Sequence, residues 1–208
     1  MQDTYKTIAN QVKAIYTEKR SKFIAYAIPI SSVEDVKPEI ERFRKEYYDA
    51  RHVCWAYMLG ADRKDFRAND DGEPSGTAGK PILGQINSNE LTNILIVVIR
   101  YFGGIKLGTS GLIVAYKEAA SMAITEAEVV EKTVDMQVSF IFEYPFMNDV
   151  MKIVKDLSPT MLHQHFDMDC QMTLQIRKAN FEELNARLSK VESLRFASET
   201  PDVEDLTK

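Results

Sequence analysis

The chain has 208 residues, of which 45% are apolar and 27% are charged, and its net charge is −5. This is the composition of an ordinary globular protein with one large or two small domains. No apolar run is long enough to cross a bilayer, and the first residues show no signal-peptide pattern. Two distant cysteines, Cys54 and Cys170, form neither a disulfide framework nor a zinc pattern. We therefore expect a cytoplasmic protein with no membrane partner.

The charge is distributed unevenly along the chain. Up to Lys132 there are 18 basic and 18 acidic residues, whereas the remainder has 8 basic and 13 acidic residues. The whole chain thus lacks the basic excess that is usual in nucleic-acid-binding proteins. Any contact with phosphate must come from a local patch, and the acidic second part places that patch in the first.

The first part of the chain is predicted to mix strands and helices. A charged turn at 18–22 separates two strand-like segments, and a continuous apolar run, Ile94 to Ile99, is typical of a strand buried on both faces. The expected elements are strands at 12–16 and 23–28, a helix from about Ser31 or Ser32, a strand at 52–59, a short helix or turn near 77–87, a strand at 93–101 and a helix at 112–126. Thr109 or Ser110 is suited to cap that last helix.

The second part is predicted to be a compact βαββαβ unit. Its expected elements are strands at 136–142, 161–167, 170–177 and 194–197, with helices at 145–157 and 181–189. This order is the ferredoxin-like arrangement. Alternation in the middle pair of strands places Leu162 and Phe166 on the buried face. The polar segment 128–133 is the expected boundary, so the domains are 1–132 and 133–208 and the fold class is α+β.

All nine glycines lie between Gly60 and Gly111, and seven of them fall in two clusters. The second cluster, residues 100–111, follows the buried strand and precedes a helix. Unpaired backbone N–H groups there would attract an anion, with Arg100 or Lys106 as the counter-charge. A tight structural turn explains the same glycines equally well. The candidate anion-binding residues of this cluster are Arg100, Gly103, Gly104, Lys106, Gly108 and Gly111. No Walker A sequence is present, because Thr109 occupies the place of its lysine.

The first cluster, residues 70–79, combines carboxylates, hydroxyls and glycines. Its spacing fails the calcium-loop pattern, and a turn held by its own side chains is the favoured use of the carboxylates. A ligand-facing loop remains open, with Asp70, Asp71, Gly72, Glu73, Ser75, Gly76, Thr77 and Gly79 as its candidate binding residues. We expect no metal site and no cofactor; His163 and His165 fit a solvated strand face.

Three more residues are candidates for a supporting role: His52, Arg51 and Arg67. His52 lies near a strand end and can point toward the glycine clusters. Cys54 shares its strand face but is expected to be a small buried residue rather than a nucleophile. The basic segments 19–22 and 63–67 are interpreted mainly as solvated turns, although either is able to touch a phosphate backbone.

These residues resemble a known family. The segments 70–79, 81–83 and 100–108, with Gly111-Leu112, Ala115-Tyr116, Asp49 to His52 and Cys54, are similar to the IMPACT/YigZ family and to its bacterial, YvyE-like members. The resemblance implies a first domain like the second domain of a small-subunit ribosomal protein, a fold shared with GHMP kinases. It also implies a second domain like the last domain of elongation factor G.

The resemblance also implies a functional setting. Eukaryotic members are linked to control of translation initiation through an extra N-terminal domain, for which this chain has no room, so we do not carry that activity over. Bacterial members bring no established reaction, and catalytic residues are unknown.

Two classes of function follow. The leading one is a binding protein that touches RNA or the ribosome in translation or stress regulation, through residues such as Arg67 and Lys106. The alternative is a small-molecule enzyme or phosphate-ligand binder that uses the glycine loops. A scaffold acting through the open sheet of the second domain, and the oligomeric state, stay open.

Overall fold

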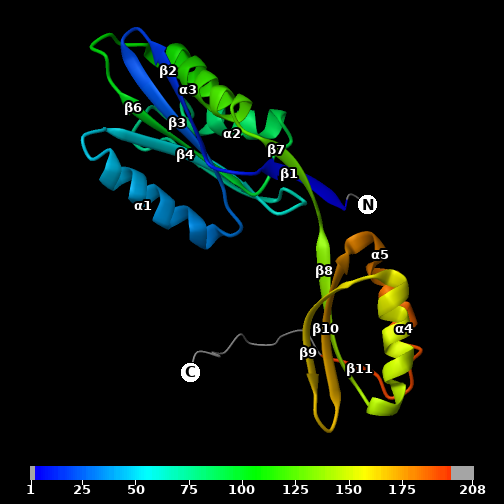
Figure 1. The fold of residues 1–208 in the computed structure, drawn as a ribbon. Coiled ribbons are helices and arrows are strands. Elements are labelled where there is room, and N and C mark those ends of the chain that lie inside the picture. Colours follow the sequence, from blue (N-terminus) through cyan, green and yellow to red (C-terminus); the bar gives the residue numbers. More distant parts are fainter. Residues whose placement is uncertain (1–2, 198–208) are drawn as a thin grey trace. The chain divides into compact units, whose positions relative to one another are not determined.

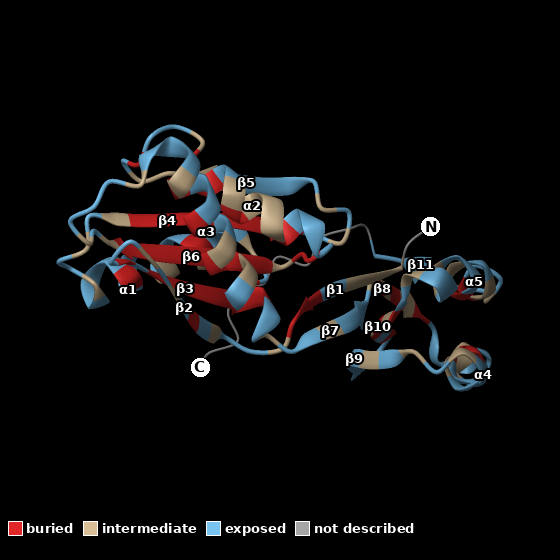
Figure 2. Ribbon diagram, turned by 90° about the horizontal axis from the view of Figure 1, so that it is seen from above, coloured by how far each residue is buried: buried red, intermediate tan, exposed pale blue. Residues whose placement is uncertain are grey.

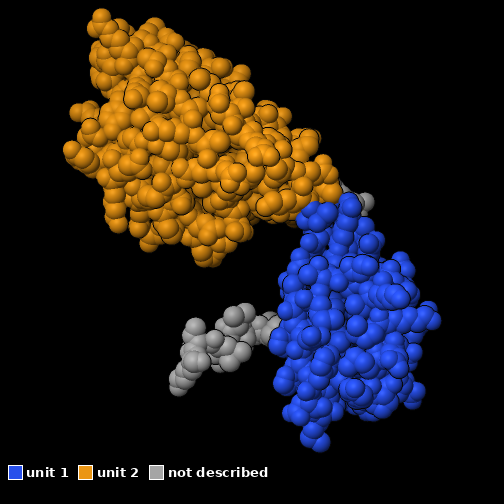
Figure 3. Space-filling view, in the orientation of Figure 1, with its two compact units in different colours: residues 1–3, 133–208 blue, residues 4–132 orange. Residues whose placement is uncertain are grey.

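The computed structural model describes residues 3–197, which form a mixed α+β structure with three sheets. The chain divides into two compact units (Figure 3). Residues 4–132 form the unit that comes first along the chain (orange, unit 2 in Figure 3), and we call it the first unit. Asp3 with residues 133–197 forms the second (blue, unit 1 in Figure 3). Each unit has its own hydrophobic core, so each is described by itself.

The first unit is built on a five-stranded antiparallel sheet with the strand order β2-β3-β6-β4-β5. Helix α1 lies on one face of this sheet, and α2 and α3 lie on the other (Figure 1). The strands are β2 (Val12–Glu18), β3 (Ser21–Pro29), β4 (His52–Leu59), β5 (Asp65–Asn69) and β6 (Ile94–Tyr101). The helices are the short η1 (Val33–Asp35), α1 (Val36–Glu46), α2 (Gly79–Ser88) and α3 (Gly108–Thr125).

Strand β6 is the centre of this unit. Its residues from Ile94 to Arg100 are all buried, as the continuous apolar run predicts, and they separate two cores. Buried residues concentrate along β3, β4 and β6 (Figure 2). On the α3 side, Ala115, Ala119 and Ala123 are fully buried, which brings the helix close to the sheet.

Three short strands lie where none is expected from the sequence. Strands β1 (Thr4–Ile8) and β7 (Val129–Thr133) pair as a two-stranded sheet, so the polar segment 128–133 is a strand rather than only a boundary. Strand β5 forms an edge of the main sheet with three of its five residues exposed. None of the three shows the alternation of apolar and polar residues that is typical of a half-buried strand. Each segment is a strand because it pairs with a neighbouring strand, which its own sequence does not reveal.

The second unit has the expected order of elements. Its strands are β8 (Asp135–Phe142), β9 (Thr160–Phe166), β10 (Cys170–Arg177) and β11 (Arg195–Phe196), and its helices are η2 (Tyr144–Phe146), α4 (Met147–Leu157) and α5 (Lys178–Leu188). They form an antiparallel sheet with the order β11-β8-β10-β9. Alternate residues of β8 and β10 are buried together with residues of α4 and α5.

The prediction that Leu162 and Phe166 are buried is wrong. Each side chain is 46% exposed. Strand β9 is an edge strand, and its register with β10 shifts between Thr173 and Leu174. Leu162 is the extra residue of this bulge, since His163 pairs with Thr173 and Met161 with Leu174, and the bulge interrupts the alternation there. Phe166 keeps its place opposite the buried Cys170, and it is exposed because β9 has no further strand beside it.

Two glycines in α2 make a matched test of this packing. A Cβ added to Gly84 would meet no atom within 4 Å, whereas one added to Gly79 would lie 2.7 Å from the backbone nitrogen of Asn69. Gly84→Ala should therefore raise the free energy of unfolding by about 0.5–1 kcal/mol, as alanine does in a helix interior. Gly79→Ala should lower it by about 1–3 kcal/mol through overpacking. Urea denaturation followed by circular dichroism measures both, and equal effects would contradict the packing described.

Candidate functional site

The first glycine cluster is organised by the carboxylate of Asp70. One of its oxygens accepts hydrogen bonds from the backbone N–H groups of Ala78, at 3.0 Å, and Gly79, at 2.8 Å. The other accepts from Gly76 N at 2.8 Å. Burial opposes ionisation of this carboxyl, but the three N–H donors outweigh it and hold its pKa below the usual value. The carboxylate thus sits at the N-terminus of α2, where an external anion would otherwise bind.

Most backbone amides of this cluster consequently have a partner inside the loop. Besides those bonded to Asp70, Thr77 N donates to the carbonyl of Pro74 at 3.0 Å, and Glu73 N donates to that of Asp70 at 3.0 Å. The N–H groups of Gly76 and Gly79 are thus not free to donate to an external anion. The favoured interpretation of the sequence, a turn held by its own side chains, agrees with these contacts. Ser75 is exposed, and its side chain has no hydrogen bond among the described residues.

Asp71 and His52 join the first cluster to the start of β4. The side chain of Asp71 accepts from Val53 N at 2.6 Å and forms an ion pair with Arg44. Its carbonyl oxygen lies 2.8 Å from Nδ1 of His52, so this ring nitrogen carries the hydrogen and donates. His52 does point toward the glycine loops, as expected, but its role here is to hold Asp71. Gly72, with φ +84°, packs beside the same ring.

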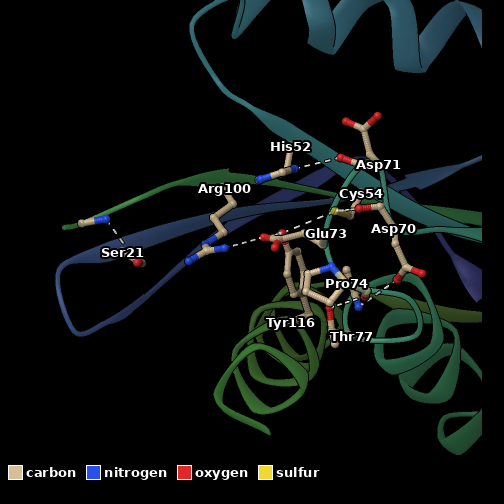
Figure 4. A network of polar contacts seen from close by, with 12 residues as sticks. Ser21, His52, Cys54, Asp70, Asp71, Glu73, Pro74, Thr77, Arg100 and Tyr116 are labelled. Atoms are coloured by element: carbon tan, nitrogen blue, oxygen red, sulfur yellow. Dashed lines mark hydrogen bonds and ion pairs between the residues drawn. The ribbon is translucent and has the colours of Figure 1, made fainter. Parts of the chain in front are cut away.

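A buried ion pair connects the two clusters (Figure 4). Glu73 from the first cluster and Arg100 from the end of β6 are each 8% exposed, and Nη1 of Arg100 donates to Oε1 of Glu73 at 2.6 Å. The hydroxyl of Tyr116 in α3 donates to the same oxygen at 2.9 Å. One carboxylate therefore ties the first loop, the central strand and α3 together.

Cys54 completes this network without being reactive. Its sulfur lies 3.0 Å from the carbonyl oxygen of Asp70 and 3.3 Å from the hydroxyl of Tyr116. Burial raises the pKa of the Cys54 thiol and also that of the Tyr116 hydroxyl, so both stay protonated. A protonated thiol and a carboxylate neutralised by Arg100 provide neither a nucleophile nor a free general base.

The second cluster is attached to the turn between β2 and β3. A Cβ added to Gly103 would lie 2.0 Å from the carbonyl carbon of Arg20, so only glycine permits this approach. Gly103 N also donates to Oγ of Ser21 at 3.2 Å. Beyond it, Gly104 and Gly108 adopt φ of +86° and +71° and face open space.

Helix α3 begins earlier than the sequence predicts. It starts at Gly108, so Thr109 and Ser110 lie inside its first turn. Neither is the N-cap; that position is Leu107, whose side chain makes no capping hydrogen bond. Glycines 108 and 111 disfavour a helix intrinsically, and the packing of the helix on the sheet overrides this preference. The N-terminal turn of α3 is therefore glycine-rich and uncapped by a side chain.

Exposed cations gather at this end of the sheet. The strand register sets the β2–β3 turn, the end of β6 and the start of β4 side by side, since Arg100 pairs with both Phe23 and His52 (Figure 1). We call this region the basic end, defined by five exposed residues: Lys19, Arg20, Lys22, Arg51 and Lys106. Within residues 3–197, none of their side chains has an ion pair or hydrogen bond.

Four carboxylates near the basic end have partners of their own. Asp71 pairs with Arg44, and Glu73 with Arg100. Asp49 accepts a hydrogen bond from the Tyr101 hydroxyl at 2.6 Å, and Glu18 accepts one from Tyr16 at 3.2 Å. The cations of the basic end thus remain available to an external anion.

The turn that carries two of these cations is strained. Glu18 pairs with Ser21, which leaves a two-residue turn in which Lys19 and Arg20 have φ of +44° and +64°. Hairpin turns of this kind favour Asn-Gly, because other residues meet a steric penalty at positive φ. The sequence alone favours a solvated turn here, with phosphate contact as a lesser option. The presence of Lys and Arg at two positions of positive φ, where Asn and Gly are favoured, marks this turn as a candidate functional segment.

The surface shows two separate hollows on the first unit. One, of about 410 Å³, is lined by residues of β5, the first cluster and α2, including Arg67, Ser75 and Lys80. The other, of about 300 Å³, is lined by Glu18, Lys19, Leu107, Ser110, Gly111 and Val114. Strand register places Arg67 opposite Tyr57, toward the start of β6, so the structure does not bring it to Lys106 at the other end.

Comparison with known proteins identifies the family. The Impact N-terminal domain family matches residues 19–124, half of the chain, and this span includes both glycine clusters. The chain belongs to the IMPACT family. It is 32% identical over 183 residues to the IMPACT family member YigZ of Escherichia coli K12, covering 87% of this chain and 90% of the relative.

Further relatives agree. An IMPACT family member of Haemophilus influenzae is 33% identical, with 86% of this chain and 87% of the relative covered. IMPACT family member YvyE of Bacillus subtilis is 38% identical over 132 residues, which are 64% of this chain and 61% of that protein. A crystal structure described as that of an hypothetical protein has a TM-score of 0.73 at 29% identity, covering 97% of this chain and all of the other.

The described residues hold neither a metal cluster nor a membrane-spanning helix. Among residues 3–197, no group of three or more His, Cys, Asp or Glu side chains is arranged to hold a metal ion. Over the same residues, no helix combines the length and apolar character needed to cross a bilayer.

Asp70 makes the stability of the first unit depend on pH. Its carboxyl has a lowered pKa in the folded state, so its stabilising contribution is complete above the unfolded value of about 3.9 and is lost as the pH falls further. Asp70→Asn should lower the free energy of unfolding by about 2 kcal/mol at pH 7, the scale of hydrogen bonds to a charged group.

The deficit of Asp70→Asn should shrink as the pH falls below about 4. Urea titrations at a series of pH values measure it. Glu128→Gln is the control, because Glu128 is exposed and its side chain has no hydrogen bond or ion pair among the described residues. A deficit that is the same at neutral and acidic pH would show that the ionised carboxylate does not hold the loop.

Proposed function

We propose that this IMPACT family protein binds RNA through the basic end of its first unit, as a regulator associated with the ribosome or with a stress response. The observation that carries the proposal is the set of five exposed cations without an ion pair or hydrogen bond among the described residues, beside four carboxylates that have other partners. Phosphate contacts by Lys and Arg supply most of the sequence-independent affinity of a protein for nucleic acid. A local patch of this kind reconciles such binding with a net charge of −5.

Strain in the β2–β3 turn gives independent support. Residues at positive φ cost about 1–3 kcal/mol each unless they are glycine, and they persist where function requires the side chain. Lys19 and Arg20 occupy both positions of the turn, where Asn and Gly would be more stable. We interpret the retained charges as phosphate contacts.

The proposal includes a fold assignment for each unit, taken from the family resemblance. We assign the first unit to the fold of the second domain of a small-subunit ribosomal protein. We assign the second to the ferredoxin-like fold of the last domain of elongation factor G, which the order β11-β8-β10-β9 of its antiparallel sheet supports. Both assignments favour a ribosome-related partner only by analogy of fold.

The turn provides a direct test of the proposal. The double variant Lys19→Asn/Arg20→Gly should raise the free energy of unfolding by about 1 kcal/mol, because it relieves the strain at positive φ. The same variant should bind RNA more weakly and lower the slope of log affinity against log salt by about one for each phosphate that it no longer binds. Fluorescence anisotropy with labelled RNA between about 50 and 200 mM salt, and urea denaturation, measure the two effects.

Two further variants complete this test. Lys106→Ala should weaken RNA binding with little change in stability, while Arg67→Ala is the control, because Arg67 is exposed in the same unit but lies away from the basic end. RNA binding that is absent or independent of salt, together with thermal stabilisation by a nucleotide or phosphometabolite, would favour the alternative of a phosphate-ligand binder.

A further inference from the structure

Two exposed aromatic rings stand at the basic end. Tyr48 follows α1 and is 85% exposed, and Phe102 follows β6 and is 57% exposed. Their sequence neighbours are joined, because the hydroxyl of Tyr101 donates to Asp49 at 2.6 Å. Tyr48 and Phe102 are thus the sequence neighbours of the two residues whose hydrogen bond links the loops.

The ring of Phe102 is held from one side. The guanidinium of Arg100 lies over it, 5.7 Å from the ring centroid. Arg100 is itself fixed by Glu73 and by the ring of Phe23, whose centroid is 5.6 Å away. A cation is attracted to the negatively polarised face of an aromatic ring, and this attraction restricts the position of the ring. Phe102 is thus supported from below and open to solvent elsewhere.

Arg100 also retains unused hydrogen-bonding capacity. Its Nε atom is buried without a partner, and only Nη1 bonds to Glu73. Its other terminal nitrogen points away from Glu73 (Figure 4). An anion that approaches Phe102 would find this donor next to the ring. A base stacked on Phe102 and its adjoining phosphate match this pair of features.

We propose that the basic end binds single-stranded rather than double-stranded RNA, with bases stacked on Tyr48 and Phe102. The proposal rests on the function proposed above and names its ligand more narrowly. Proteins that bind single strands combine a positively charged surface with aromatic side chains on which bases stack. Bases of a duplex are already stacked on one another and offer no free face to such rings. Within residues 3–197, neither ring stacks on another aromatic side chain.

The ring variants test this inference. Phe102→Leu and Tyr48→Leu keep an apolar side chain and remove the ring, and each should weaken binding of a single-stranded RNA of about 12 nucleotides by about tenfold. Phe102→Trp should retain the affinity. Phe66→Leu is the matched control, because Phe66 is 55% exposed on β5, away from the basic end. The thermal midpoint of each variant, measured alongside, separates loss of stacking from loss of folding.

Comparison of ligands separates this inference from the proposed function. The wild-type protein should bind the single strand at least tenfold more tightly than a duplex of the same sequence, and the two Leu variants should bring the two affinities together. Base stacking would be overturned if the duplex bound equally or more tightly. It would also be overturned if both Leu variants kept the wild-type affinity while Lys106→Ala weakened binding. Either result would leave the proposed phosphate contacts unaffected. Absence of binding to either RNA would overturn both proposals.

Discussion

The buried ion pair between Glu73 and Arg100 is the interaction on which the site depends. Desolvating two charges is costly, and removing one partner of such a pair typically costs about 3–5 kcal/mol. Here the pair is stabilised further by the hydroxyl of Tyr116, which donates to the same carboxylate oxygen. Because the three residues come from a loop, the central strand and α3, this contact fixes the position of both glycine loops. It also determines where Arg100, and with it Phe102, is presented.

The two glycine loops have different roles as a result. In the first, the carboxylate of Asp70 occupies the helix N-terminus and the glycines allow its close approach to the amides. In the second, Gly103 permits contact with the backbone of Arg20, which aligns the loop with the β2–β3 turn. The carboxylates of this region thus serve the fold, while the lysines and arginines of the basic end have no ion pair within residues 3–197. An acidic protein can in this way present a positive surface.

Some of this arrangement is predictable from the sequence. The apolar run Ile94 to Ile99 predicts the central strand, and alternation with helical spacing predicts the βαββαβ order of the second part. The self-bonded turn at Asp70 is the favoured alternative for its loop. The link between Glu73 and Arg100 is not predictable, because 27 residues separate them and only the packing of the loop between β5 and α2 against the end of β6 brings them together. The strain in the β2–β3 turn likewise appears only once its two-residue geometry is known.

The most direct test is an amide chemical-shift map of the ¹⁵N-labelled protein titrated with single-stranded RNA. The account predicts that shifts concentrate at 19–22, 48–52 and 102–108, while the amides of Gly76, Ala78 and Gly79 stay unchanged because Asp70 retains them. Shifts at those three amides, or shifts confined to the sheet of the second unit, would contradict it.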